Sequence, residues 1–527
     1  MLKNNRVNIV NFIRGVEPRG PVDLIEPVRE QIRLVQQNNL AATWLVQYDA
    51  LIDERFTNLL KEQLNEEQEV GAWFEFSQIL VEKIGSTWKG RWQWDWHAHV
   101  GLSIGYSPRE RELLADAYMA EFYQVFGTYP KSVGSWQIDA HMLGYMADKY
   151  GIVASCNCKD QWGTDGYTLW GGYYNQAYYP SRKNSFIPAQ QRENQISVPV
   201  FRMLGSDPIY QYDVDMNDEH AEQSVITLEP ACRAAGGGGG GDPEWVRWFF
   251  DVNFNEASLS FGYTQVGQEN AFGWELMKEG LTDQIQLLAE RQSMGELQVE
   301  TLAQTGIWYR SNYELTPASS VVARKDWKNE GKQSVWFSNR NYRLNVYWDH
   351  DQFWLRDIHF YDESYEERYL TEVCAGPTCL YDALPVLDGA RWGEADSKAG
   401  IYPICHHSDG SIGQLKGNKP ILENLNEEEL RISVALDGGG YLVIHCALDK
   451  IMVQSDMKGW GLRMNWNEAR AIPITEVSDS SIHYVYNHYP YKINCEDGTI
   501  LIDEQKAGEL TIVPERQAIV LCPLGNG

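Results

Sequence analysis

The stretch GTYPKSVGSWQIDAHMLGYMADKYGIVASCNCKDQ, residues 127–161, indicates the fold class because it holds two expected strands joined by one helix. A strand over residues 131–136 follows a Tyr-Pro turn, apolar residues at helical spacing predict a helix over 139–150, and a second strand follows over 152–155. Asp139 comes directly after the first strand, where barrel enzymes place catalytic groups. Asp is also a preferred helix N-cap, so Asp139 is expected to be either a catalyst or a cap.

Outward from this stretch, strand-like and helix-like segments alternate up to about residue 290, which is typical of a parallel sheet with crossover helices. Further helices are expected over residues 24–38, 53–63 and 108–126. The pattern predicts an α/β fold with a seven-stranded (β/α) barrel, one strand short of the common eight. The seven strands are expected over residues 7–13, 41–47, 70–76, 131–136, 152–155, 196–203 and 257–264.

The periodicity changes after a helical stretch around residues 282–302. Short alternating or apolar runs then follow one another, separated by Gly, Asp and Asn turns, which predicts an all-β, sandwich-like C-terminal domain. We therefore expect a barrel domain over residues 1–315 and a β domain over residues 316–527. A run of six glycines at 236–241 predicts an irregular, mobile surface loop.

Composition narrows the classes of partner. The 527 residues are enough for two or three domains, and the net charge of -28 argues against nucleic acid or an anionic membrane as partner. No apolar run is long enough for a membrane span, and the N-terminus lacks the features of a signal peptide, so a cytoplasmic protein is expected. The odd count of nine Cys favours free thiols. The 20 Trp and 29 Tyr suit either stacking on sugar rings or aromatic cores.

Polar side chains follow each expected barrel strand, and the carboxyl ends of parallel strands meet at one rim. Carboxylates crowded together there should include some of raised pKa, which suits a general acid. His97 and His99 alternate with tryptophans and are candidates for sugar contact, for metal ligation with Asp95, or for structural hydrogen bonding. The candidate substrate-binding residues are Arg14, Glu17, Asp49, Trp73, Glu75, His97, His99, Trp136, Asp160, Gln161, Arg202, Asp207 and Gln268.

The order of strands, together with the run from His99 through Ser107-Pro108 and a long helix to Gly127-Thr-Tyr-Pro130, resembles the seven-stranded glycoside hydrolase/deacetylase superfamily. The resemblance covers roughly the first 290 residues. The NodB-type deacetylase pattern is not met, because its Asp-Asp after strand one is replaced by the run from Arg14 to Glu17. Its paired histidines at strand three are likewise replaced by Trp73-Phe74-Glu75.

The pattern of glycoside hydrolase family 57 is closer. Its Trp-x-x-Glu, whose Glu is the nucleophile, is similar to the stretch from Trp136 to Asp139 with Asp in place of Glu. Its last-strand acid is followed by Phe-Gly-His-Trp, and this chain has Glu269-Asn-Ala-Phe-Gly-Trp274, with Gln268 and Glu269 both candidates for the acid. The stretches VNFIRGVEPR, GSWQIDAH and VFRMLGSDPIYQYD resemble a bacterial family of unknown function.

The sequence therefore predicts a glycoside hydrolase with Asp139 as nucleophile or base and Glu269 as general acid, acting on a carbohydrate without a cofactor. Two alternatives stay open. One is a carbohydrate deacetylase that holds a divalent metal with His97 and His99, and the other is a carbohydrate-binding protein without turnover. The sugar, the linkage and the oligomeric state are not predicted.

Overall fold

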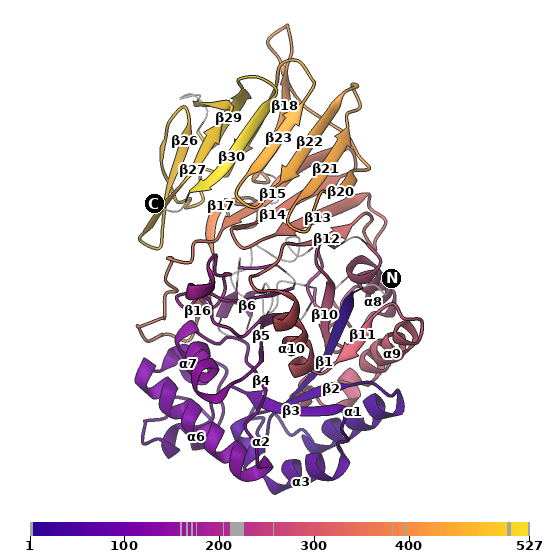
Figure 1. The fold of residues 1–527 in the computed structure, drawn as a ribbon, viewed down its shortest axis with the longest axis vertical. Coiled ribbons are helices and arrows are strands. Elements are labelled where there is room, and N and C mark those ends of the chain that lie inside the picture. The colour runs from indigo at the N-terminus through magenta and orange to yellow at the C-terminus, as the bar shows by residue number, and fades with distance from the viewer. Residues whose placement is uncertain are drawn as a thin grey trace.

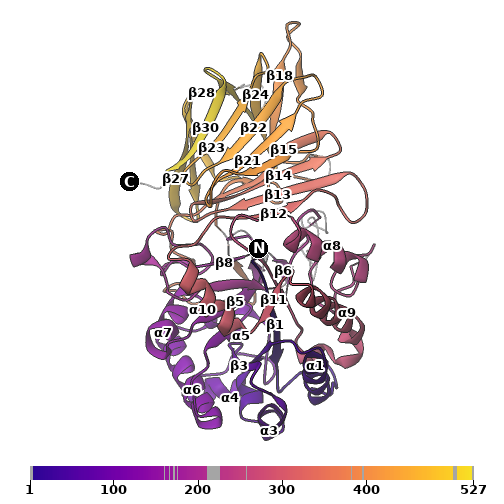
Figure 2. The ribbon, with the colours of Figure 1, turned by 45° about the vertical axis from the view of Figure 1, so that its right-hand side comes forward.

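The computed structural model describes residues 4–524 except 159–160, 165–166, 170–171, 175, 204, 211–225, 235, 257, 382, 395–396 and 503–506. The molecule has two parts along its longest axis, an α/β barrel at one end and a β-sandwich at the other (Figures 1 and 2). The N-terminus lies near the junction between them (Figure 1).

Seven parallel strands form the barrel in the order β10-β1-β2-β3-β4-β5-β9. They correspond to the seven predicted strands, so the expected fold class is confirmed. At the seam between the first and last strands of this order, the rings of Phe201 and Tyr263 pack with centroids 5.1 Å apart. The strands are β1 (Asn5–Ile13), β2 (Ala42–Val46), β3 (Gln68–Trp73), β4 (Ser132–Gly134), β5 (Ala154–Cys158), β9 (Val200–Met203) and β10 (Gly262–Val266). Two short strands extend this sheet, β8 (Ala177–Tyr178) beside β9 and β11 (Gln298–Glu300) beside β1.

Helices cover the outside of the barrel (Figure 1). The longest predicted helix is confirmed as α6, whose start is set by Pro108 in the first turn and by a capping box between Ser107 and Glu110. It ends at Gly127, which adopts the left-handed conformation. The helices are α1 (Ile25–Gln37), α2 (Tyr48–Leu51), α3 (Glu54–Gln63), α4 (Gln78–Lys83), α5 (Ala98–Gly101), α6 (Pro108–Phe126), α7 (Ala140–Tyr150), α8 (Pro243–Phe254), α9 (Trp274–Ser293) and α10 (Leu302–Asn312), with 3-10 turns η1 (Ser103–Gly105), η2 (Arg192–Asn194) and η3 (Asn270–Phe272).

The C-terminal region is a sandwich of two largely antiparallel sheets. One has the order β12-β13-β14-β15-β18-β24-β29-β28, with β17 and β19 at its side, and the other has the order β20-β21-β22-β23-β30-β27-β26-β25. Apolar side chains of both sheets, such as Leu344 and Ile432, share one buried core.

The strands of the first sheet are β12 (Ser319–Ala323), β13 (Lys332–Ser338), β14 (Tyr342–Asp349), β15 (Gln352–Phe360), β17 (Leu384–Asp388), β18 (Gly400–His406), β19 (Ile412–Gln414), β24 (Trp460–Asn465), β28 (Gly498–Ile502) and β29 (Glu509–Pro514). Those of the second are β20 (Ile421–Asn424), β21 (Leu430–Ala435), β22 (Tyr441–Cys446), β23 (Ile451–Ser455), β25 (Ile474–Val477), β26 (Ser481–Tyr486), β27 (Tyr489–Glu496) and β30 (Ala518–Leu524).

The segment between β15 and β17 leaves the sandwich and lies against the barrel. It carries β16 (Cys379–Tyr381), which pairs in parallel with β7 (Tyr167–Leu169), and β7 pairs with β6 (Gln161–Thr164). Cys374 donates its backbone N–H to the carbonyl of Ile104, and Ala98 donates to the carbonyl of Pro377. A connection within the β region thus contacts the chain that follows β3 and the chain that follows β5.

The run of six glycines is irregular, as predicted, but it is packed rather than loose. A Cβ on Gly240 would lie 2.1 Å from the carbonyl oxygen of Leu228, so this backbone approaches its neighbour more closely than any other residue allows. All nine cysteines are free thiols. No helix in the described part of the chain has the length and apolar character needed to span a membrane.

Candidate active site

Three side chains from three different strand ends meet at the carboxyl-end rim of the barrel. Arg14 follows β1, Glu75 follows β3 and Glu269 follows β10. The Arg14 guanidinium donates Nε and Nη2 to Glu75 Oε2, at 3.1 and 2.8 Å, and Nη1 to Glu269 Oε1 at 2.9 Å. All three side chains are only 3% exposed. One buried cation therefore holds two carboxylates, and the barrel order brings them together.

All described hydrogen bonds to the Glu75 carboxylate go to one of its two oxygens. Its Oε2 accepts both hydrogen bonds from Arg14 and a third, of 2.7 Å, from the indole N–H of Trp73. Three N–H donors on one oxygen suit an ionised carboxylate. Within the described part of the chain, Glu75 Oε1 has no hydrogen bond.

Glu269 differs from Glu75 because its surroundings favour the protonated carboxyl. Burial, together with the negative charge of Glu75, raises the pKa of Glu269 to about 8, although Arg14 opposes the change. Its Oε2 is buried and has no hydrogen-bond partner in the described part of the chain. A carboxyl that is protonated near neutral pH and presents an unengaged oxygen has the properties of a general acid.

Asp49 and Glu17 border this cluster. Asp49 follows β2, accepts the backbone N–H of Gly15 at 3.3 Å, and its burial raises its pKa to about 6. Glu17 binds Arg19 through both carboxylate oxygens, at 2.8 and 2.6 Å, and Arg19 Nη2 also lies 3.7 Å from Glu269 Oε1. The structure thus places both predicted residues beside the ion-paired centre.

Asp139 lies in a different environment. Its Oδ1 accepts the backbone N–H of Met142, which is the N-cap interaction of α7, and also accepts Arg111 Nη1 at 3.0 Å. Asp139 and Arg111 are fully buried. Glu367 from the β15–β17 connection accepts the next backbone N–H, that of Ala140, and burial with the charge of Asp139 raises the Glu367 pKa. Within the described contacts, Asp139 and Glu269 share no partner.

Trp73 and Trp136 pack together next to Glu75, which Trp73 contacts directly. Trp73 stacks on Phe12 at 4.2 Å, and Trp136 meets both rings edge-on at 5.2 and 5.7 Å. Trp73 is fully buried and Trp136 is 6% exposed. These rings therefore pack as core, and the N–H of Trp73 orients Glu75.

His97 and His99 lie side by side in the loop after β3, with ring centroids 5.9 Å apart. His97 Nδ1 is 3.2 Å from Asp95 Oδ1, and burial lowers the His97 pKa. Asp95 is itself paired with Arg91 at 2.8 Å. No group of three or more His, Cys, Asp or Glu that could hold a metal ion occurs among the described residues.

The remaining candidates are spread around the rim. Arg202 is buried and donates to the side chain of Asn157 at 3.2 Å. Asp207 is fully buried and accepts the indole N–H groups of Trp245 and Trp327, which gives it a structural role. Asp160 lies outside the described residues, and Gln161 belongs to β6, where its side chain is not described.

Gln268 orients a further carboxylate that sequence reasoning missed. Its Nε2 donates to Glu229 at 3.1 Å, and the charge of Glu229 contributes to the raised pKa of Glu269. Glu229 lies far from any predicted strand, so no local pattern could indicate it. Trp94, one of the tryptophans that alternate with His97 and His99, also belongs to this centre, because the Arg14 guanidinium lies 3.9 Å from the centroid of its ring.

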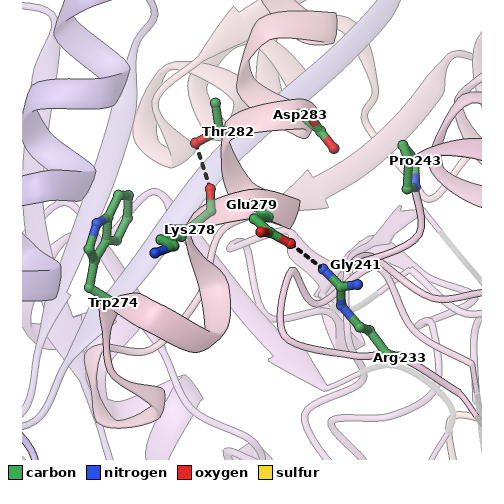
Figure 3. A pocket seen from close by; sticks show the side chains of 8 residues that line it. All are labelled: Arg233, Gly241, Pro243, Trp274, Lys278, Glu279, Thr282 and Asp283. Carbon is green, nitrogen blue, oxygen red and sulfur yellow. Dashed lines mark hydrogen bonds and ion pairs between the residues drawn. The ribbon is translucent and has the colours of Figure 1, made fainter.

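A separate groove of about 640 Å³ lies where α8 and α9 begin (Figure 3). Trp274, Lys278 and Thr282 of α9 lie on one side, and Pro243 and Arg233 face them (Figure 3). Arg233 is paired with Glu279 across the groove at 3.0 Å. None of the three residues of the buried ion-paired centre lines this groove.

Comparison with known proteins supports the fold and leaves the family open. No family model matches the sequence, and no curated protein matches it. A solved structure from Parabacteroides distasonis, of a protein assigned as a glycoside hydrolase/deacetylase, is similar with a TM-score of 0.53 and 16% identity, over 73% of this chain and 91% of that chain. The chain has the glycoside hydrolase/deacetylase fold.

Weaker likenesses are found to a family 57 branching enzyme of Thermococcus kodakaraensis and to the peptidoglycan deacetylase PdaC of Bacillus subtilis. The first has a TM-score of 0.29 and 12% identity, over 59% of this chain and 72% of that chain. The second has a TM-score of 0.25 and 13% identity, over 58% and 94%. The glycoside hydrolase/deacetylase fold does not by itself specify a reaction, so the chemistry has to be argued from the side chains.

Proposed function

We propose that the protein is a glycoside hydrolase in which Glu269 is the general acid and Glu75 is its ionised partner. The observation that supports this most directly is the guanidinium of Arg14 held between the two carboxylates, with the pKa of Glu269 raised to about 8. Two carboxyl groups of different protonation state are the minimal machinery for cleaving a glycosidic bond.

In the proposed reaction, Glu269 transfers its proton to the glycosidic oxygen as the bond from that oxygen to the anomeric carbon breaks. Glu75 either attacks the anomeric carbon or removes a proton from the water that does so. Water supplies the new hydroxyl group on the sugar, and Glu269 regains its proton before the next turnover. Arg14 stays charged and prevents repulsion between the two carboxylates once Glu269 has ionised.

The sequence predicts Asp139 as the partner of Glu269, and Asp139 is the alternative to Glu75 in this role. Its hydrogen bonds to the N-terminus of α7 and to Arg111 account for its burial without catalysis. Glu75, by contrast, has an oxygen without a described hydrogen bond and shares a cation with Glu269. This difference favours Glu75, which sequence reasoning named as a substrate-binding residue.

Removing each acid separately tests the proposal on two kinds of substrate, natural oligosaccharides and aryl glycosides with a phenol that leaves without protonation. Glu269→Gln should lose activity on oligosaccharides by orders of magnitude and much less on the activated aryl glycosides. Glu75→Gln should lose activity on both. Equal losses on both substrates in Glu269→Gln, or near-parental turnover in Glu75→Gln, would contradict the assignment.

The same panel separates the rival functions. An acetylated oligosaccharide that loses acetate without chain cleavage would indicate a deacetylase, and binding without any product would indicate a carbohydrate-binding protein. We propose a carbohydrate as the only partner class, since the net charge of -28 disfavours nucleic acid and anionic membranes.

A further inference from the structure

A pair of tryptophans lies between the surface and the buried carboxylates. Trp92 is 41% exposed and stacks on Trp96, with centroids 5.3 Å apart and planes 22° from parallel. Trp96 contacts Trp94 at 5.9 Å, and Trp94 lies against Arg14. We call Trp92 and Trp96 the tryptophan platform.

Arg19 connects this platform to the general acid. Its guanidinium lies 5.6 Å from the ring of Trp96, and its Nη2 lies 3.7 Å from Glu269 Oε1. The Arg19 side chain is 40% exposed, so it borders both the solvent and the buried site. A ligand resting on Trp96 would therefore lie next to the group that we propose to protonate the leaving oxygen.

Hydrogen bonds within the segment from Trp88 to Asp95 hold the tryptophan platform in position. Arg91 pairs with Asp95 through two hydrogen bonds of 2.8 Å and lies 4.2 Å from the Trp92 ring, which closes the turn between the two tryptophans. Trp88 donates its indole N–H to the carbonyl of Trp92 at 2.7 Å. The indoles are thus held in place before any ligand binds.

The charges at the platform are balanced within the chain. Arg19 is neutralised by Glu17, and Arg91 is neutralised by Asp95. Among the described residues, the two arginines that lie over these rings are therefore both paired, which disfavours a carboxylated or sulfated sugar. The indoles cover one face of each other and Arg91 lies over both rings, so the parts of the indole faces that stay uncovered are the ones that suit the apolar face of a neutral sugar ring. Polar atoms of Arg19 and His97 at the edge can bind its hydroxyl groups.

We propose that Trp92 and Trp96 form a binding subsite for one unit of a neutral oligosaccharide chain, next to the unit whose bond is cleaved. The substrate is then a chain of several neutral sugars rather than a small glycoside. This inference rests on the proposed function for the position of cleavage, but binding at the platform does not require turnover.

The test is a binding series on the Glu269→Gln protein, with and without Trp92→Ala or Trp96→Ala. Calorimetry with neutral gluco-oligosaccharides and N-acetylglucosamine oligosaccharides of increasing length should show affinity rising with length. Each tryptophan variant should lose about tenfold in affinity for the longer ligands and nothing for the shortest, since one ring contact contributes about a factor of ten. Tyr441→Ala removes an aromatic ring on the sandwich that is 60% exposed, more than Trp92, and should have no effect.

An equal loss at every length, unchanged affinity in both tryptophan variants, tighter binding of oligogalacturonates than of neutral chains, or no binding of any oligosaccharide would overturn the subsite. The two proposals fail separately. Length-dependent binding through Trp92 without hydrolysis by the parent protein would support the subsite and contradict the hydrolase. Hydrolysis of oligosaccharides with a kcat/KM that is the same in the parent and in Trp92→Ala at every chain length would support the hydrolase and contradict the subsite.

Discussion

Replacing Glu269 by Gln should change how the stability of the protein depends on pH. The carboxyl has an ordinary pKa of 4.5 when the chain is unfolded and a pKa of about 8 in the folded protein, because it is buried beside Glu75. Between these values the folded state keeps a proton that the unfolded state has lost. The free energy of unfolding therefore falls as pH rises through this window.

The size of the effect follows from the two pKa values. They differ by about 3.5, and each pKa unit corresponds to about 1.4 kcal/mol, so the parent protein should lose up to about 5 kcal/mol between pH 4.5 and 8 from this group. Gln has nearly the same shape and does not titrate. The Gln amide beside Arg14 changes the free energy of unfolding by an amount that does not depend on pH. The variant should therefore lack the decline in stability between pH 4.5 and 8.

Urea unfolding at half-unit steps from pH 4.5 to 8.5 measures the difference between parent and variant. Glu275→Gln is the control, since Glu275 on α9 is 80% exposed and should leave the profile unchanged. A parent-minus-variant difference that stays constant across this window would show that Glu269 is ionised in the folded protein. That result would also remove the basis for its role as a general acid.

Three further predictions can be checked separately. Asp139→Asn should lose about 3 kcal/mol in urea unfolding because it leaves Arg111 buried without its charge partner, whereas Asp148→Asn on the exposed face of α7 should lose less than about 1 kcal/mol; equal losses would contradict the buried pair. Burial lowers the His359 pKa, but Asp357 outweighs burial, and the net effect is a pKa above 6.5 in the folded protein. The stability that protonated His359 contributes is therefore fully present below pH 6.5 and is lost as pH rises through the folded pKa. His359→Gln should remove that alkaline decline, and a parallel profile would refute it. Finally, chelator treatment should leave hydrolysis unchanged, because two carboxylates complete the proposed chemistry, and loss restored by zinc or manganese would favour His97 and His99 as metal ligands.

Much of the architecture could be predicted from local patterns. The buried strands of a parallel barrel are short apolar runs, and signals such as the capping box at Ser107 mark where helices begin. Alternating or apolar runs of strand length predicted the all-β, sandwich-like C-terminal region. Because every catalytic candidate follows a strand, the sequence alone also indicated the rim on which polar groups gather.

The roles of those groups depended on contacts between distant parts of the chain. Glu75 and Glu269 lie 61 and 255 residues from Arg14, and only the order of strands in the barrel sheet, with β1 next to β10 and two strands from β3, brings all three together. Asp139 obtains Arg111 as its partner from the preceding helix and Glu367 as its neighbour from the β region. Periodicity reports which side of an element is buried, whereas ionisation depends on desolvation and on charges a few ångströms away. Sequence therefore determined which acids follow the barrel strands, and tertiary structure decided which of them are buried together on one cation and which one caps a helix.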